Sequence, residues 1–173
     1  MTSLWFIYCL KQRQTDSADC SLHWIFMEFC MNPKIAKKAE AVEFGWALRD
    51  FGLNILVSDV ATTVLFLEQV LQMKTHRSNR DFAVLESHRT YFQLHADHTY
   101  HSNPLPSLLP KAGNRGAGIE LRLYDTDPDA CEEKARAFDY VVLRESEDRP
   151  HGLRECYLLD PDGYCWVPSK VIK

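Results

Sequence analysis

The chain has 173 residues, of which 46% are hydrophobic and 25% are charged, and its formal net charge is -4. This composition excludes a disordered chain, and the lack of a long basic stretch argues against a nucleic-acid-binding surface. No stretch reaches the about 20 apolar residues that a transmembrane helix requires, so we predict one domain without a transmembrane segment.

The spacing of the cysteines bears on whether the protein is found in an oxidising or a reducing compartment. The six cysteines include no CxxC pair and no zinc-finger spacing. Disulfides form in oxidising compartments, whereas free thiols are typical of the cytoplasm. We therefore predict a cytoplasmic protein with reduced cysteines.

Residues 1–44 differ from the rest of the chain. They are rich in Trp, Phe and Cys and show no steady hydrophobic period. Three interpretations stay open: an appended helix that packs on the domain or on a partner, a membrane-surface segment, or a start codon assigned upstream of Met27 or Met31. The predicted domain spans residues 45–173.

A repeated motif organises that domain. Gly52-Leu-Asn-Ile-Leu-Val-Ser-Asp59 and Gly118-Ile-Glu-Leu-Arg-Leu-Tyr-Asp125 share a glycine, alternating apolar residues and an aspartate at the same distance. The alternation predicts a strand, and the aspartate can cap the helix that follows. The repeat predicts two tandem βαβββ modules, over about residues 51–97 and 117–169.

The other predicted elements follow in chain order. In the first module, we predict strands at 52–58, 82–85 and 90–95 and a helix at 60–72. In the second, we predict strands at 119–124, 141–144, 153–159 and 164–167 and a helix at 129–138 that is entered through residues 125–128.

Two connecting segments carry strong signals. Asp160-Pro-Asp-Gly163 predicts a tight turn, because proline presets φ and glycine accepts positive φ. Residues 98–118 hold three prolines and three glycines and form a long connection, of the kind that often serves as a lid or a site wall.

The two modules, with Gly152-Leu-Arg-Glu155 and Leu159-Asp-Pro-Asp-Gly-Tyr164, resemble the vicinal oxygen chelate superfamily. This group contains glyoxalase I, bleomycin-resistance proteins, fosfomycin-resistance proteins and extradiol dioxygenases. The resemblance implies an α+β fold in which two tandem βαβββ modules form an open U-shaped eight-stranded mixed sheet. The helices would cover the convex face, and the concave face would hold the ligand.

The resemblance also implies where a metal would be bound in the metal-dependent members. Its four ligand positions fall at Gly52, at or next to Gln93, at Gly118 and at Val167. Three of these four residues have no side-chain donor, and a divalent ion needs three or more side-chain ligands. We therefore expect the usual metal site to be absent and predict no metal and no cofactor.

Strand parity predicts which side chains line the cleft. From the first module these are Asn54, Ser58, Tyr91, Gln93 and His95. From the second module these are Glu120, Arg122, Tyr124 and Cys165. The seventh strand leaves two alternatives, because either Arg154 and Cys156 or Glu155 and Tyr157 face inward.

Glu120 and Arg122 have two interpretations. They either pair with neighbours in a satisfied polar interior, or they anchor a polar ligand on which tyrosines stack. In the second case, Arg122 or Arg154 suits a carboxylate or phosphate. Glu120 is then the candidate general base, provided that burial raises its pKa.

The histidines also have two interpretations. His88, His95, His98 and His101 lie close together in the sequence and could form an unconventional metal site with Asp97. His98 and His101 open the proline-rich connection, however, so we expect surface histidines and single out only His95. We likewise expect His151 to be an exposed loop residue rather than one that closes over the cleft.

These expectations favour a bleomycin-resistance-like protein that binds a small polar or aromatic molecule without a metal, as a homodimer. The candidate ligand-binding residues are Asn54, Tyr91, Gln93, His95, Glu120, Arg122, Tyr124 and Arg154. One alternative is a superfamily lyase, isomerase or dioxygenase that uses displaced ligands such as His95 and Glu120, or metal-free general base chemistry. Another is a regulatory or scaffold module with residues 1–44 as its partner-binding piece.

Overall fold

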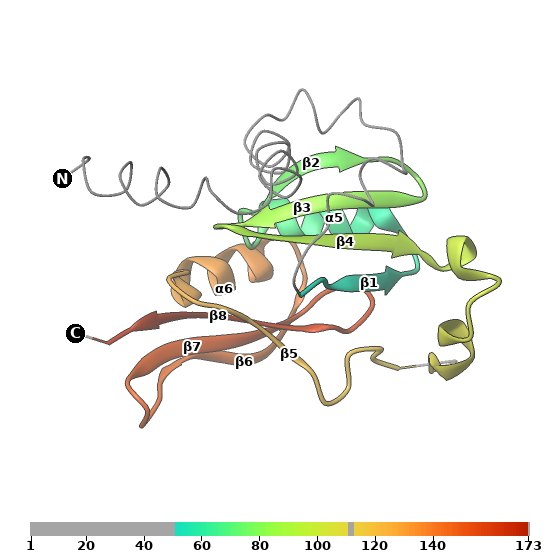
Figure 1. Cartoon of the computed structure of the whole chain (residues 1–173). Helices are drawn as coiled ribbons and strands as arrows, with labels where there is room; N and C mark the ends of the chain where they lie inside the picture. The colour runs from blue at the N-terminus through green and yellow to red at the C-terminus, as the bar shows by residue number, and fades with distance from the viewer. Residues whose placement is uncertain (1–50, 111–112, 173) are drawn as a thin grey trace, which may run out of the picture. The chain divides into compact units, whose positions relative to one another are not determined.

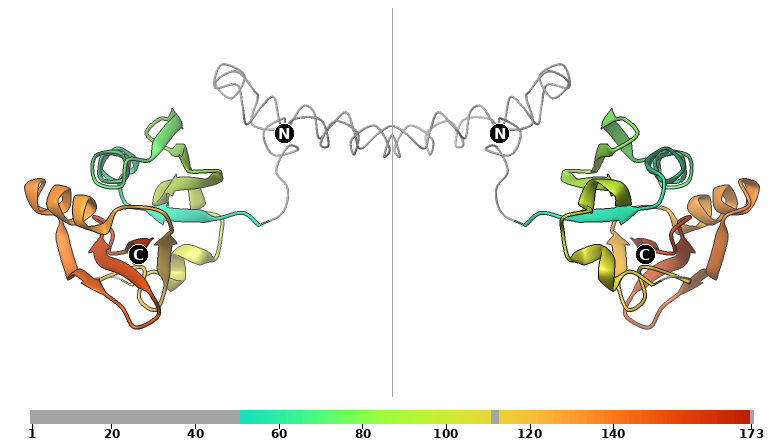
Figure 2. Two further views of the ribbon diagram at one scale, coloured as in Figure 1. Left: turned by 90° about the vertical axis from the view of Figure 1, so that its left-hand side faces the viewer. Right: turned by 90° about the vertical axis from the view of Figure 1, so that its right-hand side faces the viewer.

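The computed structural model describes residues 51–110 and 113–172. The predictions for residues 1–44 lie outside the described residues. Within the described part, the chain forms eight β-strands, two α-helices and two short 3-10 helices. Figure 1 shows the order of these elements, and Figure 2 shows them from two further directions.

The first module is one βαβββ unit. Its elements are β1 (Asn54–Val57), α5 (Val60–Gln69), β2 (Lys74–Ser78), β3 (Phe82–Ser87) and β4 (Thr90–Ala96). The strands form a four-stranded sheet in the order β1-β4-β3-β2. β1 runs parallel to β4, whereas the β4–β3 and β3–β2 pairs are antiparallel.

The second module repeats this plan. Its elements are β5 (Glu120–Leu123), α6 (Pro128–Ala137), β6 (Val141–Asp148), β7 (Leu153–Leu159) and β8 (Cys165–Val171). They form a second mixed sheet in the order β5-β8-β7-β6. The connection between the modules holds η1 (Asp97–Tyr100) and η2 (Leu105–Leu108). The predicted α+β fold with two tandem βαβββ modules is confirmed.

Several details differ from the prediction: α5 ends at Gln69, β6 continues to Asp148 and β8 continues to Val171. β2 was not predicted, because Lys-Thr-His-Arg-Ser lacks the apolar alternation that marks a strand, and only His76 in it is buried. The second helix begins at Pro128 with Asp127 as its N-cap, whose carboxylate accepts the backbone N–H of Asp129 at 3.0 Å. Asp125, the repeat's counterpart of the first module's cap, instead adopts a left-handed backbone with φ of 55°.

The first helix begins as predicted. The Asp59 carboxylate accepts the backbone N–H of Thr62 at 2.7 Å, which satisfies a helix N-terminus. The apolar side of α5 then packs on the sheet through Val64, Phe66 and Leu67.

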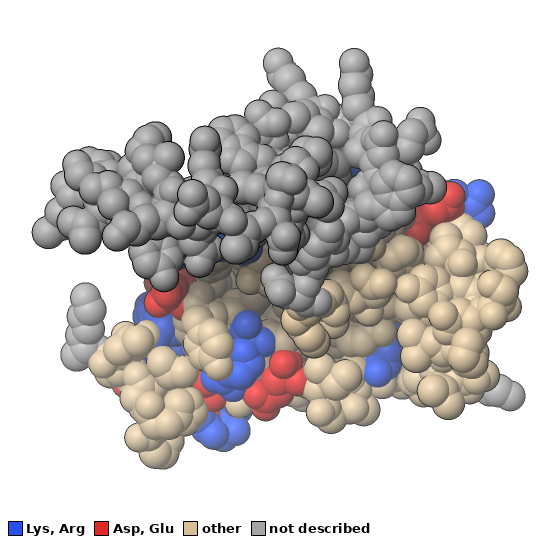
Figure 3. Space-filling view, viewed as in Figure 1, with Lys and Arg blue, Asp and Glu red and all other residues tan. Residues whose placement is uncertain are grey.

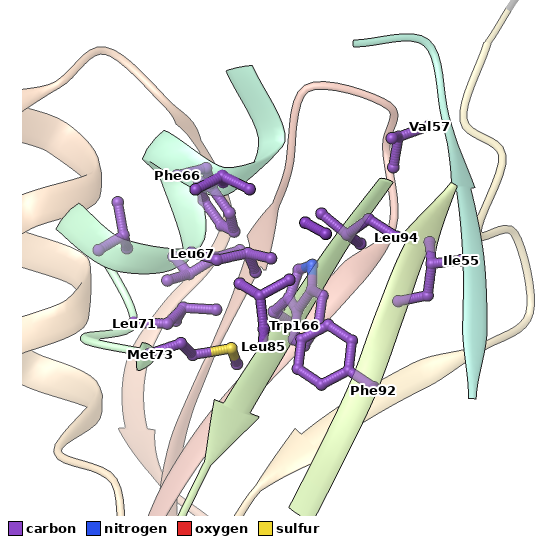
Figure 4. Packing of buried hydrophobic residues seen from close by; sticks show 14 of the residues in the cluster. Ile55, Val57, Phe66, Leu67, Leu71, Met73, Leu85, Phe92, Leu94 and Trp166 are labelled. Atoms are coloured by element: carbon purple, nitrogen blue, oxygen red, sulfur yellow. The ribbon is translucent and has the colours of Figure 1, made fainter. Parts of the chain in front are cut away.

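One hydrophobic core serves both modules. Its members come from α5, from α6 through Cys131 and Ala135, and from the helix-bearing faces of the two sheets. The Phe92 ring lies 5.7 Å from the Trp166 ring, centroid to centroid, so the two sheets contact each other directly (Figure 4). The Phe66 ring meets the Tyr140 ring edge-on at 4.9 Å.

The Asp160–Gly163 turn fastens the second module to the first. Asp162 accepts the backbone N–H of Ser58 at 2.8 Å, and the Tyr164 hydroxyl donates to the Leu56 carbonyl at 2.9 Å. Both bonds satisfy groups on the edge of β1 that faces away from β4, because β1 pairs with no other strand of its sheet.

Buried Asp160 holds the turn itself. Its carboxylate accepts the backbone N–H groups of Asp162 and Tyr164 at 3.0 and 2.9 Å, and the Trp166 indole N–H at 3.0 Å. Burial raises the pKa of Asp160 to about 6 despite these donors.

None of the described helices combines the length and apolar character that a bilayer crossing requires.

Candidate functional site

The face of each sheet opposite its helix, called the helix-free face below, carries most of the predicted site residues. On β4, Phe92, Leu94 and Ala96 are buried toward the core. Tyr91, Gln93 and His95 alternate with them and are only partly buried, so they lie on the helix-free face. The register places Asn54 beside Gln93 and Leu56 beside His95.

His95 is the centre of an aromatic cluster. Its ring lies 4.9 Å from the Phe82 ring and 5.1 Å from the Tyr100 ring. Its Nε2 is 3.3 Å from Gln93 Oε1. Burial lowers the pKa of His95, which favours the uncharged imidazole at neutral pH.

Asn54 lies next to this cluster. Its side-chain nitrogen is 3.5 Å from the Tyr100 hydroxyl, at the limit of a hydrogen bond. The ring of Tyr91 lies further along the same face, 5.3 Å from the ring of His76. Nε2 of His76 in turn contacts Glu86 at 2.5 Å.

The helix-free face of the second module is built around a buried carboxylate. Glu155 is 1% exposed and accepts a short hydrogen bond from Arg122 Nη2 and another from the Tyr157 hydroxyl at 3.1 Å. Burial opposes ionisation of Glu155, but the bonds from Arg122 and Tyr157 outweigh it and lower its pKa. Of the two alternatives for β7, the structure therefore has Glu155 and Tyr157 on this face.

Further charges surround the same carboxylate. Arg149 Nε and His151 Nε2 each lie 3.4 Å from Glu155. Arg122 also donates from Nη1 to Glu120 at 2.9 Å, and its guanidinium carbon lies 5.8 Å from the centre of the Tyr124 ring. Figure 3 accordingly shows basic and acidic side chains beside one another over the second module. The guanidinium of Arg122 is thus already paired with Glu120 and Glu155.

Arg154 is not part of this group. Its guanidinium makes ion pairs with Asp129 of α6 at 2.6 Å and with Asp148 at 2.9 Å. The adjacent Cys156 thiol donates to the Pro128 carbonyl at the start of α6. The structure thus places Arg154 with the helix, whereas the sequence had grouped it with the cleft residues.

The two sheets show where the metal ligands implied by the resemblance would lie. Asn54 pairs with Gln93, and Glu120 pairs with Cys165. The β4 residue equivalent to Val167 is therefore His95, and the position expected at or next to Gln93 is corrected by two residues. The four positions then hold Gly52, His95, Gly118 and a fully buried Val167. One imidazole cannot hold a divalent ion, so this donor set does not fit the metal.

The remaining histidines do not gather around His95. His98 pairs with Asp81 at 2.8 Å, and His101 contacts the His98 carbonyl. His88 sits in the β3–β4 turn with φ of 55°. Asp97 is paired with Arg115. Among residues 51–110 and 113–172, no group of three or more His, Cys, Asp and Glu side chains is placed to hold a metal ion.

A pocket of about 270 Å³ lies between β1, the segment around η2 and the start of β5. It borders the His95 cluster through Asn54, which lines it, and Leu56 also contributes to its wall. The lining residues are Leu53, Asn54, Ile55, Leu56, Leu105, Leu108, Leu109, Pro110, Arg115, Ile119, Leu121 and Tyr164.

Most of these lining residues were not predicted, and Asn54 is the only candidate ligand-binding residue among them. The proline-rich connection was expected to act as a lid or site wall, and its leucines do line the pocket. The signal was present in Pro104-Leu-Pro-Ser-Leu-Leu-Pro110, because leucines in a connecting loop need apolar surface to cover.

The chain matches one protein family over most of the described residues. Residues 51–167 match the Glyoxalase/Bleomycin resistance protein/Dioxygenase superfamily. No curated protein gives a significant match.

Solved structures share this architecture. A glyoxalase/bleomycin resistance protein/dioxygenase family enzyme from Burkholderia phytofirmans PsJN is 18% identical, with a TM-score of 0.58 over 69% of this chain and 96% of that one. A hypothetical protein from S. aureus is 16% identical, with a TM-score of 0.59 over 71% and 94%. A glyoxalase-related enzyme from Fulvimarina pelagi is 14% identical, with a TM-score of 0.57 over 71% and 88%. At these identities, the similarity shows the fold alone.

Proposed function

Because the chain belongs to the Glyoxalase/Bleomycin resistance protein/Dioxygenase superfamily, we propose that it binds a small molecule in the cleft of this fold without a metal ion. The observation that carries the proposal is the pocket of about 270 Å³ beside Asn54 and the His95 cluster. A largely apolar concavity with a few polar groups at one side is the usual form of a small-molecule site.

The metal-independent part of the proposal rests on the ligand positions. Gly52, Gly118 and Val167 offer no donor atom, so a ligand cannot be held by chelation to an ion there. The binding free energy must come from apolar contact with the pocket and from hydrogen bonds at its polar side. The sequence had predicted a polar cleft, whereas the pocket supports a ligand with a larger apolar part.

Thermal unfolding of the full chain with small aromatic compounds tests the proposal. A bound compound should stabilise the protein by about 2.7 kcal/mol at a hundredfold excess over its dissociation constant. Ile119→Trp fills the pocket from a residue that is 54% exposed and should remove this stabilisation. Leu65→Trp, at a site on α5 that is 49% exposed and outside the pocket, should keep it.

A second candidate is an enzyme that uses metal-free general base chemistry. The observation that favours it is the position of His95: burial lowers the pKa of its imidazole, and its Nε2 lies 3.3 Å from Gln93 Oε1. Glu120, the base considered from the sequence, is 47% exposed and paired with Arg122, so it lacks the burial that this role needs. This candidate would be established if the protein converts a bound compound to a product and the His95→Gln variant does not.

We also propose that the protein is a cytoplasmic homodimer. Val141 and Leu143 on β6 are 56% and 60% exposed, which supports an apolar surface available to a second copy. The described cysteines are free thiols, which supports a reducing compartment. Light scattering of the purified full chain and fractionation of cells test these two statements.

A further inference from the structure

Among the residues that the structure describes, Arg115 is the one charged residue that lines the pocket, and two carboxylates already neutralise its charge. Arg115 donates from Nη1 and Nη2 to the two oxygens of Asp97 at 2.7 and 2.8 Å. Its Nε lies 3.0 Å from Asp162 Oδ1. Two carboxylates thus cover both edges of the guanidinium, and its side chain is only 15% exposed.

The polar groups that remain are neutral. The Tyr164 hydroxyl gives its proton to the Leu56 carbonyl. The Asn54 amide makes one contact at 3.5 Å with Tyr100 and is otherwise exposed, so it can still donate to and accept from a ligand. All other lining residues are leucine, isoleucine or proline.

We propose that this pocket selects an uncharged compound, with a bicyclic or similar hydrocarbon body and one amide-like or hydroxyl group directed at Asn54. This inference rests on the proposed function. Roughly 150 Å³ accommodates one benzene ring, so about 270 Å³ suits a body of this size. A charged group would lose its hydration in the pocket without gaining a free counter-charge from the described lining residues, which is costly.

Four naphthalene compounds separate the effect of charge from that of shape. 1-Naphthamide and 1-naphthoate have nearly the same shape and differ in charge, 1-naphthylmethylamine carries a positive charge, and naphthalene lacks the polar group. Calorimetric titration of the full chain should show 1-naphthamide binding at least about tenfold more tightly than either ion. Equal or tighter binding of 1-naphthoate or of the amine would overturn the inference.

The result also distinguishes this inference from the proposed function. If the acid and the amide bind equally well, small-molecule binding stands and selection against charge is wrong. If none of the four compounds binds, both proposals are wrong.

Substitution at Asn54 tests the polar anchor. In Asn54→Leu, 1-naphthamide should lose its advantage over naphthalene, while naphthalene still binds. The matched control is Gln69→Leu, which removes an amide from the end of α5 outside the pocket and should leave the advantage unchanged. An unchanged advantage in Asn54→Leu would contradict the assignment of the anchor.

Discussion

Arg122 Nη2 donates to Glu155 Oε2, and this bond joins a partly exposed arginine of β5 to a carboxylate that is 1% exposed on β7. The two strands are not neighbours, since β8 lies between them in the sheet. The pair therefore bridges the helix-free face across a strand. A buried carboxylate that loses its main partner is costly, which makes this pair a test of how the second module is held together.

Arg122→Met should lower the free energy of unfolding by about 3 kcal/mol, because it leaves Glu155 buried with weaker partners. Chemical denaturation of the full chain measures this change. Arg136→Met is the control: Arg136 is 51% exposed and pairs with Glu132 and Glu145. Its loss should change the free energy of unfolding much less than Arg122→Met does, because water screens an exposed ion pair. Equal costs for the two variants would show that the Glu155 pair is not a buried interaction.

Acid should destabilise the protein through the same carboxylate. The folded-state pKa of Glu155 lies below its ordinary value of 4.5. A depressed carboxyl pKa contributes stability above the unfolded-state pKa, and this stability is lost as the pH falls through the folded-state pKa. Denaturation measured from pH 6 downward should therefore show a loss below pH 4.5 that is smaller in Glu155→Gln. A variant with the same acid profile as the parent would contradict this assignment.

His95 should titrate below the ordinary histidine value of 6.5, because burial disfavours the imidazolium. Between the folded-state and unfolded-state pKa values, the unfolded chain binds more protons, so this group's contribution to stability is present above pH 6.5 and falls as the pH falls. NMR of the ring Cε1–H reports the folded value directly. Tyr100→Ala uncovers one side of the ring and should raise the pKa, while Tyr124→Ala, in the other module, should not.

Gly116 should tolerate no side chain. A Cβ at this residue would lie 2.7 Å from the Tyr164 Cα, a backbone atom that cannot move aside cheaply. Gly116→Ala should therefore cost about 1 to 3 kcal/mol. Gly52→Ala is the control, since a Cβ there meets nothing within 4 Å. Similar unfolding midpoints for the two variants would show that Gly116 does not lie against the Tyr164 backbone.

The repeat in the sequence predicted the fold because its strands, helix cap and turn depend on residues that are close together in the chain. Alternation around Ile55 and Val57 and the cap at Asp59 follow from near neighbours in the chain, and so does the turn at Asp160–Gly163. β2 escaped prediction because its strand character depends on pairing with β3 and not on its own apolar residues.

The site was less predictable, because its partners are distant in the sequence. The alternation of side chains along β7 could not decide whether Arg154 or Glu155 lies on the helix-free face. The ion pair of Arg154 with Asp129 and that of Glu155 with Arg122 decide it. The pocket was missed for a similar reason. Leu105, Leu109 and Ile119 become neighbours of β1 only after the long connection has folded back onto the first module.

The most direct test of the account is calorimetric binding of 1-naphthamide to the full chain, before and after treatment with a chelator and after addition of zinc or manganese. We predict one dissociation constant under all these conditions, because Gly52, Gly118 and Val167 supply no ligand atoms. Binding that vanishes with the chelator and returns with the ion would contradict metal-independent recognition in this cleft.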